Sequence, residues 1–488
     1  MTLDRTPEYL TGLIAELSNL KGEAEWVEFK ENNADPQEIG EYVSALANSA
    51  PLCGKPSAYL VWGIRDRTHE VVGTSFVPGK QKVGNEELEN WLLRAVKPKI
   101  DFRFFAFNFG IFPVVVMEIG RAFRHPVAFQ GVEFIRVGTY KKKLKDYPER
   151  ERELWRILDA TPFESLIAVE RTAPTDVLRL LDYPAYFELM NRPLPDSRMA
   201  ILNALAESEL IHSCEAGGWN ITNLGAVLFA RRLDDFRSLK RKPIRVIQYQ
   251  GNSRIATLRE QVGSKGYASG FEGLISYING ILPSNEIIHK ALRETVPVYP
   301  EIAVRELVAN ALIHQDFFVV GAGPMVEIFS DRMEISNPGK PLVDTSRFLD
   351  TPPKSRNESL ASLMRLFGIC EERGSGIDKV VFETELYQLP APSFEHLEET
   401  TRAVLFSPKP LTRMVTEDRI RACYLHACLR YVNRDFMTNT TLRERFGISA
   451  ENSAIASRLI KEATSAGAIR AHDSDAGKKY MKYVPFWA

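Results

Sequence analysis

The alternation of apolar and polar residues predicts a mixed α/β arrangement in the first third of the chain. Apolar side chains recur at helical spacing in residues 8–20, whereas AYLVWGI at 58–64 is a continuous apolar run of strand length. FRFFAFNFG at 102–110 and PVVVMEIG at 113–120 favour two further strands, and VAFQGVEFIRVG at 127–138 is typical of a hairpin around a glycine. Helices are expected between the strands, as in other mixed domains.

The pattern changes after the charged stretch YKKKLKDYPERERELW, and proline-containing breaks then separate short helical segments. A second mixed region follows, with strands at 325–330, 332–339 and 401–406 and a helix at 358–367. We therefore expect a multidomain α+β protein. The domain boundaries that we predict are 1–148, 149–225 for a helical connector, 226–408, and 411–488.

Composition narrows the class of protein. Hydrophobic residues make up 44% and charged residues 26% of the chain, and the net charge of -1 requires any basic surface to be local. The five cysteines are scattered and form no CxxC pair, which favours reduced thiols over disulfides or a zinc site. No apolar run approaches the roughly 20 residues of a membrane span, so we expect a cytoplasmic protein with no membrane partner.

RELVANALIHQDF at 305–317 reads as a helix with polar residues in unusual places. Glu306 and Asn310 are four residues apart and share one helix face, beside an apolar stripe. The amide oxygen of Asn310 is suited to a magnesium ion that bridges phosphates, and Glu306 is suited to orienting a water molecule. A carboxylate and an amide beside apolar residues are costly unless they have a function.

Two glycine-containing turns extend this candidate site. Asn337-Pro338-Gly339 ends a predicted strand, where glycine allows close approach of a ligand to the backbone. ERGSGI at 372–377 leads into a helix and offers backbone N–H groups to phosphates. The residues of these turns that we expect to bind the nucleotide are Asn337, Gly339, Gly374, Ser375 and Gly376.

Three blocks in order, RELVANALIHQDF, VEIFSDRMEISNPGKPL and KSRNESLASLMRLFGICEERGSGI, resemble the GHKL (Bergerat-fold) ATPases, in their divergent RecG-like branch. The resemblance implies an α/β sandwich that binds ATP and Mg²⁺, with Asn310 as the metal ligand and Glu306 activating water if ATP is hydrolysed. It also implies a homodimer as one arrangement. Asn337 stands where most members carry the aspartate that reads adenine. The chain has no GxxxxGK[ST] phosphate loop, so helicase activity is not supported.

GEAEWVEFK at 22–30 places several carboxylates before Lys30, and Asp66 follows the buried strand at a turn. Three converging carboxylates, Glu23, Glu28 and Asp66, would bind divalent metal for phosphodiester hydrolysis. The opening, the ALANS helix and the EFIRVG strand resemble the Schlafen/AlbA-like domain. Nuclease members of that family use three acidic residues, whereas many bacterial members only bind nucleic acid. The residues that we expect to contact phosphates here are Lys30, Arg65, Arg136 and Lys142.

Residues 411–488 carry 13 Lys and Arg against 8 Asp and Glu, an excess of five positive charges. Helices at 419–432, 438–449 and 450–469, followed by a strand-turn-strand, resemble a winged helix. Such a domain is expected to bind duplex DNA, although winged helices also serve protein contacts. The DNA-binding residues that we predict are Ser453, Arg458, Lys461, Lys478 and Lys479.

Three functions remain open at this point: an ATP-binding, DNA-binding transcriptional regulator or switch, a metal-dependent nuclease of RNA or DNA gated by ATP and serving in defence, and a protein-binding scaffold. The regulator requires least beyond the visible residues. ATP would then act by favouring one conformation over another.

Overall fold

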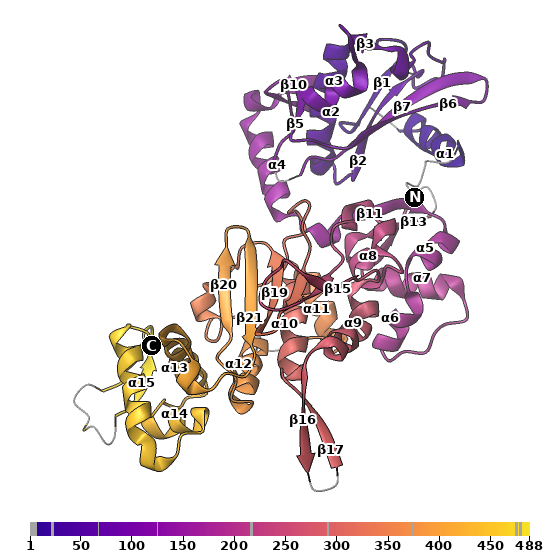
Figure 1. The fold of residues 1–488 in the computed structure, drawn as a ribbon. Helices are drawn as coiled ribbons and strands as arrows, with labels where there is room; N and C mark the ends of the chain where they lie inside the picture. The colour runs from indigo at the N-terminus through magenta and orange to yellow at the C-terminus, as the bar shows by residue number, and fades with distance from the viewer. Residues whose placement is uncertain are drawn as a thin grey trace. The chain divides into compact units, whose positions relative to one another are not determined.

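The computed structural model describes residues 7–20, 24–66, 68–123, 125–214, 218–289, 292–371, 375–473, 477 and 481–488. The chain divides into two compact units, residues 1–171 with 213–220, and residues 172–212 with 221–488. Both units mix helices and strands (Figure 1), which confirms the multidomain α+β fold. Within the described residues, none of the helices combines the length and apolarity needed to cross a membrane.

The first unit contains two four-stranded sheets, with orders β1-β2-β7-β6 and β10-β9-β8-β5. In the first sheet only β1 and β2 are parallel, and Val27 lies opposite Tyr59. The strands are β1 (Val27–Lys30), β2 (Ser57–Trp62), β5 (Val96–Lys97), β6 (Phe102–Phe109), β7 (Phe112–Gly120), β8 (Ala128–Phe129), β9 (Val132–Val137) and β10 (Tyr140–Lys143). The helices are α1 (Pro7–Ser18), α2 (Pro36–Leu52), α3 (Leu88–Ala95) and α4 (Pro148–Ala160). After the turn that follows β2, Val71 forms a single antiparallel bridge to Ile64.

Helix α2 carries the ALANS segment, and its polar residues are buried because they bond to backbone groups of the second sheet. Ser44 Oγ donates to Val127 O at 2.6 Å, and Asn48 Nδ2 donates to the same oxygen at 2.9 Å. The Asn48 amide oxygen accepts from Val127 N at 2.7 Å. Satisfying these groups inside the protein offsets the cost of burying the helix's polar side chains.

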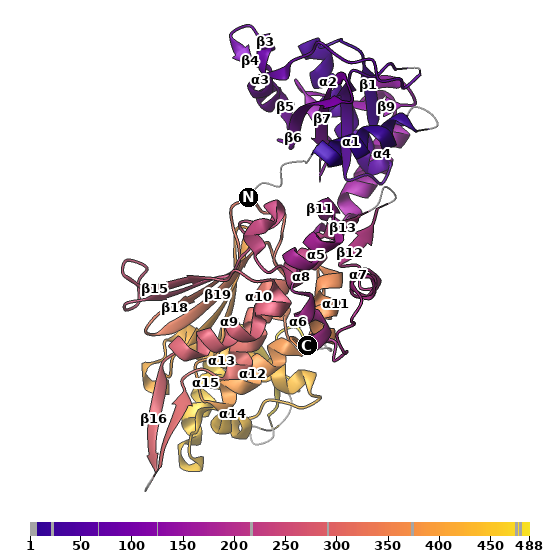
Figure 2. The ribbon, with the colours of Figure 1, turned by 90° about the vertical axis from the view of Figure 1, so that its right-hand side faces the viewer.

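The second unit contains a six-stranded sheet of order β15-β14-β18-β19-β21-β20, in which only the pairing of β14 with β18 is parallel. Helices α9 and α10 lie along this sheet (Figure 2). Its strands are β14 (Arg245–Tyr249), β15 (Thr257–Val262), β18 (Met325–Ile328), β19 (Arg332–Pro338), β20 (Ser393–Leu397) and β21 (Thr400–Phe406). The associated helices are α8 (Asn223–Phe229), α9 (Tyr267–Ile281), α10 (Glu301–Ile313), α11 (Glu358–Leu366) and α12 (Gly376–Leu386).

Outside this sheet lie a hairpin, three further helices and, in the connecting region whose residues are divided between the two units, three short strands. A hairpin is formed by β16 (Ser284–His289) and β17 (Leu292–Pro297). The region before the sheet holds the helices α5 (Pro174–Leu180), α6 (Tyr183–Leu189) and α7 (Arg198–Glu207). Short strands in the connecting region are β11 (Ile167–Thr172), β12 (Ile211–Ser213) and β13 (Trp219–Thr222), so the connector predicted as helical also contains strands.

The C-terminal part has the element order that the sequence predicts. Helices α13 (Thr416–Val432), α14 (Asn439–Phe446) and α15 (Ser453–Ser465) precede the antiparallel pair β22 (Ile469–Ala471) and β23 (Tyr483–Pro485). A bridge from Met437 to Tyr483 adds a third segment to this small sheet. Thr438 caps α14 through a capping box, and Gly447 ends it in the left-handed conformation.

Candidate nucleotide-binding site

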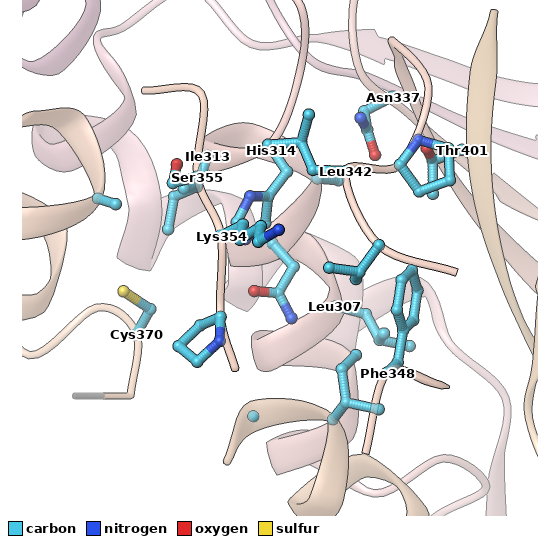
Figure 3. Close-up of a pocket in the computed structure, with 18 of the residues that line it drawn as sticks. Leu307, Ile313, His314, Asn337, Leu342, Phe348, Lys354, Ser355, Cys370 and Thr401 are labelled. Atoms are coloured by element: carbon cyan, nitrogen blue, oxygen red, sulfur yellow. The ribbon is translucent and has the colours of Figure 1, made fainter. Parts of the chain in front are cut away.

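Helix α10 places Glu306 and Asn310 on the wall of a cavity of about 550 Å³, which we call the pocket. Glu306 is buried and Asn310 is half-buried, because the rest of α10 is packed into the core around Leu307 and Val308. Leu307 and Phe348 lie on one side of the pocket and Cys370 on the other (Figure 3). A pocket of this volume falls within the range of small-molecule and cofactor sites.

The start of α12 meets α10 at Gly376, which also lines the pocket. A Cβ at this glycine would lie 2.7 Å from Glu306 Oε2 and 3.7 Å from Asn310 Nδ2, so a larger residue here would require the Glu306 carboxylate to move. Burial, followed by the nearby Glu371 carboxylate, raises the pKa of Glu306. Ser375 precedes this helix, whereas the predicted ligand residue Gly374 lies outside the described residues.

Asn337 reaches the pocket from the end of β19, opposite Thr401 on β21 (Figure 3). Its amide nitrogen donates to Pro338 O at 3.2 Å, which leaves the Oδ1 atom as an acceptor. The neighbouring Gly339 has a φ of 110°, and a Cβ there would lie 2.8 Å from the Cβ of Asp316. The turn therefore requires glycine for both conformation and space.

His314, for which the sequence leaves open a place beside the site or at the helix end, has both: it follows α10 and lines the pocket. Burial, followed by the charge of Arg356, lowers its pKa to about 4. Arg356 and Cys370 also line the pocket and were not singled out from the sequence. Arg356 is held by Asp316, with 3.2 Å between Nη1 and Oδ2. Burial raises the pKa of the Cys370 thiol to about 11, so this thiol is neutral at physiological pH. The cationic side chains that line the pocket are Lys340, Lys354, Arg356, Arg365 and Arg402.

Two of these cations, Lys354 and Arg356, belong to the segment KSRN at 354–357, which Asn357 holds in place. The Asn357 amide donates to Ile313 O at 2.7 Å and to Gln315 O at 2.9 Å, at the end of α10. Such contacts join segments that are distant in sequence. A local pattern contains no signal for them.

The pocket suits a magnesium-bound nucleotide. It has an amide and a buried carboxylate on α10, a glycine at the start of a helix, and cations for phosphates. Nowhere in the described part of the chain do three or more His, Cys, Asp or Glu side chains group to hold a metal. Magnesium bound through phosphates needs only one or two protein ligands, so Asn310 is sufficient in principle.

In the first unit, Glu28 is buried on β1 and is paired with cations. Its carboxylate contacts the buried Arg136 guanidinium and lies 2.7 Å from Lys30 Nζ. Asp66 is exposed at the turn after β2, and Arg65 there pairs with Glu31 and Glu70. The structure thus places Arg136 inside the domain and Arg65 at the surface, and the third predicted carboxylate, Glu23, lies outside the described residues.

Lys142 is exposed on β10, the edge strand that pairs with β9. Its neighbour Lys141 pairs with Glu41 at 2.6 Å. The basic run at 140–143 is therefore part of a sheet rather than a linker. Lys142 remains available to solvent, as a phosphate contact would require.

In the C-terminal part, Ser453, Arg458 and Lys461 are all exposed on α15. The opposite face of this helix buries Ala456, Leu459 and Ile460 in a core with α13 and α14. The helix therefore presents the predicted polar face outward. The predicted contacts Lys478 and Lys479 lie outside the described residues.

Comparisons with known proteins agree with two of these regions. Residues 23–145 match the family described as "Schlafen, AlbA_2". Residues 321–405 match the family described as "Putative ATP-dependent DNA helicase recG C-terminal". No protein with a curated description matches the chain. The crystal structure of the DIP2311 protein from Corynebacterium diphtheriae is similar, at 18% identity over 97% of this chain and 96% of that one, with a TM-score of 0.42. The chain therefore fuses a Schlafen/AlbA-like domain to an ATPase-type domain of the RecG C-terminal kind.

Proposed function

We propose that this protein is an ATP-binding, DNA-associated switch, in which Mg²⁺-ATP occupies the pocket of the second unit. The two domain types suggest nucleotide binding and nucleic-acid association. The observation that carries the proposal is the meeting of Glu306, Asn310 and Gly376 at one wall of the pocket. Burying a carboxylate is costly without compensation, and a bound metal or water at this wall would offset that cost.

Each residue has a defined role in this proposal. Asn310 holds the metal, and the start of α12 at Gly376 faces the phosphates with its free N–H groups. Bound magnesium supplies charge neutralisation for the phosphates. Glu306 accepts a proton or orients water if the nucleotide is hydrolysed. His314 is neutral at physiological pH, so it adds a hydrogen-bonding group without adding charge.

Asn337 favours adenine as the base. The bond from Nδ2 to Pro338 O orients the Asn337 amide, and in this orientation Oδ1 accepts a hydrogen bond from an exocyclic amino group, which adenine has at C6. Guanine presents a carbonyl at the same position, so the Asn337 amide would have to turn and present an N–H group to it. We therefore expect ATP to bind more tightly than GTP.

The DNA-binding part of the switch is α15 with its exposed Ser453, Arg458 and Lys461. The net excess of positive charge in 411–488 supports DNA as the partner. In the first unit, the pairing of Glu28 with Arg136 and Lys30 favours nucleic-acid association over metal-dependent cleavage, because a carboxylate with two cationic partners is a poor metal ligand.

Calorimetry with Mg²⁺ and a non-hydrolysable ATP analogue tests the proposal. We expect binding to the full chain, and loss of magnesium-dependent binding in Asn310→Ala. The matched control is Asn433→Ala, which removes the same group from an exposed position after α13. Equal affinity of Asn310→Ala and wild type would refute the assignment of the pocket.

A further inference from the structure

One segment of the second unit faces the pocket on one side and the C-terminal helices on the other. We call residues 344–350 the strap. Phe348 of the strap lines the pocket (Figure 3) and packs edge-to-face on Phe394, with ring centroids 5.5 Å apart. The next residue, Leu349, is buried in a separate cluster with Ala422 and Leu425 of α13. Two consecutive residues of the strap thus contact the pocket and helix α13, respectively.

The C-terminal part also holds the strap through polar and aromatic contacts. The Tyr424 hydroxyl on α13 donates to Ser346 O. Trp487 Nε1 in turn donates to the Tyr424 oxygen at 3.0 Å. The Arg347 guanidinium lies 4.4 Å from the centroid of the Trp487 ring, a cation–π contact. Burial, followed by the nearby Cys428, raises the pKa of Tyr424, so its hydroxyl keeps its proton for this bond.

Helix α12 forms a second connection between the same two places. It begins at Gly376, against Glu306 in the pocket. Near its other end, Glu385 lies 2.9 Å from His426 Nδ1 and 3.4 Å from Arg445 Nε. Arg445 is buried and donates to Leu389 O at 2.6 Å. The C-terminal part therefore holds both the strap and the helix that together border the pocket.

We propose that Tyr424 and Trp487 are positioning residues of the nucleotide pocket: they fix the strap, and through it Phe348, in the place that the nucleotide requires. The inference rests on the proposed function. Because coupling between two sites is reciprocal, nucleotide binding in turn stabilises the arrangement of α13 that the strap contacts. The occupied pocket thereby influences the domain that carries α15.

The test compares Trp487→Ala, Trp487→Phe and Tyr424→Phe with wild type, all as full chains. Calorimetry with the Mg²⁺-bound ATP analogue should show affinity lowered about 10-fold in Trp487→Ala, within the usual range of coupling. Trp487→Phe keeps an aromatic ring over Arg347 and should recover most of the affinity. The control Arg413→Ala, at an exposed position before α13, should bind the nucleotide as wild type does.

A spectroscopic readout separates positioning from a loss of folding. Nucleotide addition should change the tryptophan emission of wild type, and loss of this change in Trp487→Phe would identify Trp487, among the six tryptophans, as its source. In Tyr424→Phe, which keeps Trp487 but loses the bond to Ser346 O, the change should require more nucleotide while circular dichroism is unaltered. If wild type binds the analogue and Trp487→Ala binds equally well, the inference fails and the proposed function stands. If wild type binds no adenine nucleotide, both fail.

Discussion

Glu306 on α10 lies against Gly376 on α12, with its Oε2 atom 2.7 Å from the position that a Cβ of residue 376 would take. Gly376→Ala should therefore push the two helices apart or displace the carboxylate. We expect a loss of about 1–3 kcal/mol in the free energy of unfolding, as for other overpacked sites, together with weaker nucleotide binding. Urea unfolding and calorimetry measure the two effects.

The control for this substitution is Gly273→Ala in α9, where nothing lies within 4 Å of an added Cβ. There the change should stabilise the helix by about 0.5–1 kcal/mol, because alanine has the higher helix propensity. Stabilisation by Gly376→Ala as well would show that the contact with Glu306 is not tight.

The buried ion pair of Glu28 and Arg136 should contribute to the stability of the first unit. Removing the carboxylate leaves a buried guanidinium with less compensation, so Glu28→Ala should cost about 3–5 kcal/mol in the free energy of unfolding. Glu70→Ala, which breaks the exposed pair with Arg65, should cost less than about 1 kcal/mol. Similar small losses for both variants would contradict the structural role of Glu28.

Cleavage assays bear on the same residue. Labelled single-stranded DNA, RNA and tRNA, each with manganese, should remain intact with wild type if the first unit only binds nucleic acid. Cleavage that disappears in a folded Glu28→Gln variant would instead favour the nuclease. The glutamine variant is preferred for this assay because it keeps the shape of the side chain.

His314 predicts a pH dependence. Its pKa is lowered in the folded state to about 4 from 6.5, so below pH 6.5 the unfolded chain binds a proton that the folded chain does not. The free energy of unfolding should therefore fall as the pH drops from about 6.5 to about 4, by about 2 kcal/mol at pH 5. His314→Gln should flatten this part of the profile, and His396→Gln, an exposed histidine on β20, should not.

Helix α15 predicts the salt dependence of DNA binding. Arg458→Ala or Lys461→Ala should weaken duplex DNA binding across sequences and reduce the slope of log affinity against log salt by about 1 each. Arg413→Ala removes the same charge from an exposed position before α13 and should leave the slope unchanged. Fluorescence anisotropy at several salt concentrations measures both quantities.

The sequence predicts that α10 exists because its signals are local, although the helix runs over Glu301–Ile313 rather than 305–317. Apolar residues at helical spacing indicate α10. Glycines stand at two other helix ends: Gly376 at the start of α12 and Gly447 after α14. Threonine and glycine are common cap residues, and the structure has Thr438 and Gly447 at the two ends of α14. Local residue chemistry is sufficient for such elements.

The features that the sequence does not predict depend on distant partners. Three consecutive lysines in β10 give no apolar alternation that would predict a strand, and the strand forms because it pairs with β9. Arg136 looks like a surface cation in sequence, but the fold buries it in contact with Glu28 on β1 and the ring of Tyr42. Likewise, Arg356 reaches the pocket because Asn357 bonds to the end of α10.

Because both ends of helix α12 make contacts, the number of residues between them is constrained. Each residue of an α-helix turns it by about 100°, so a single insertion between Gly376 and Glu385 would rotate the second half away from His426 while leaving the first half beside Glu306. Homologous proteins that keep both contacts should therefore differ in many loops but conserve the residue spacing of this helix.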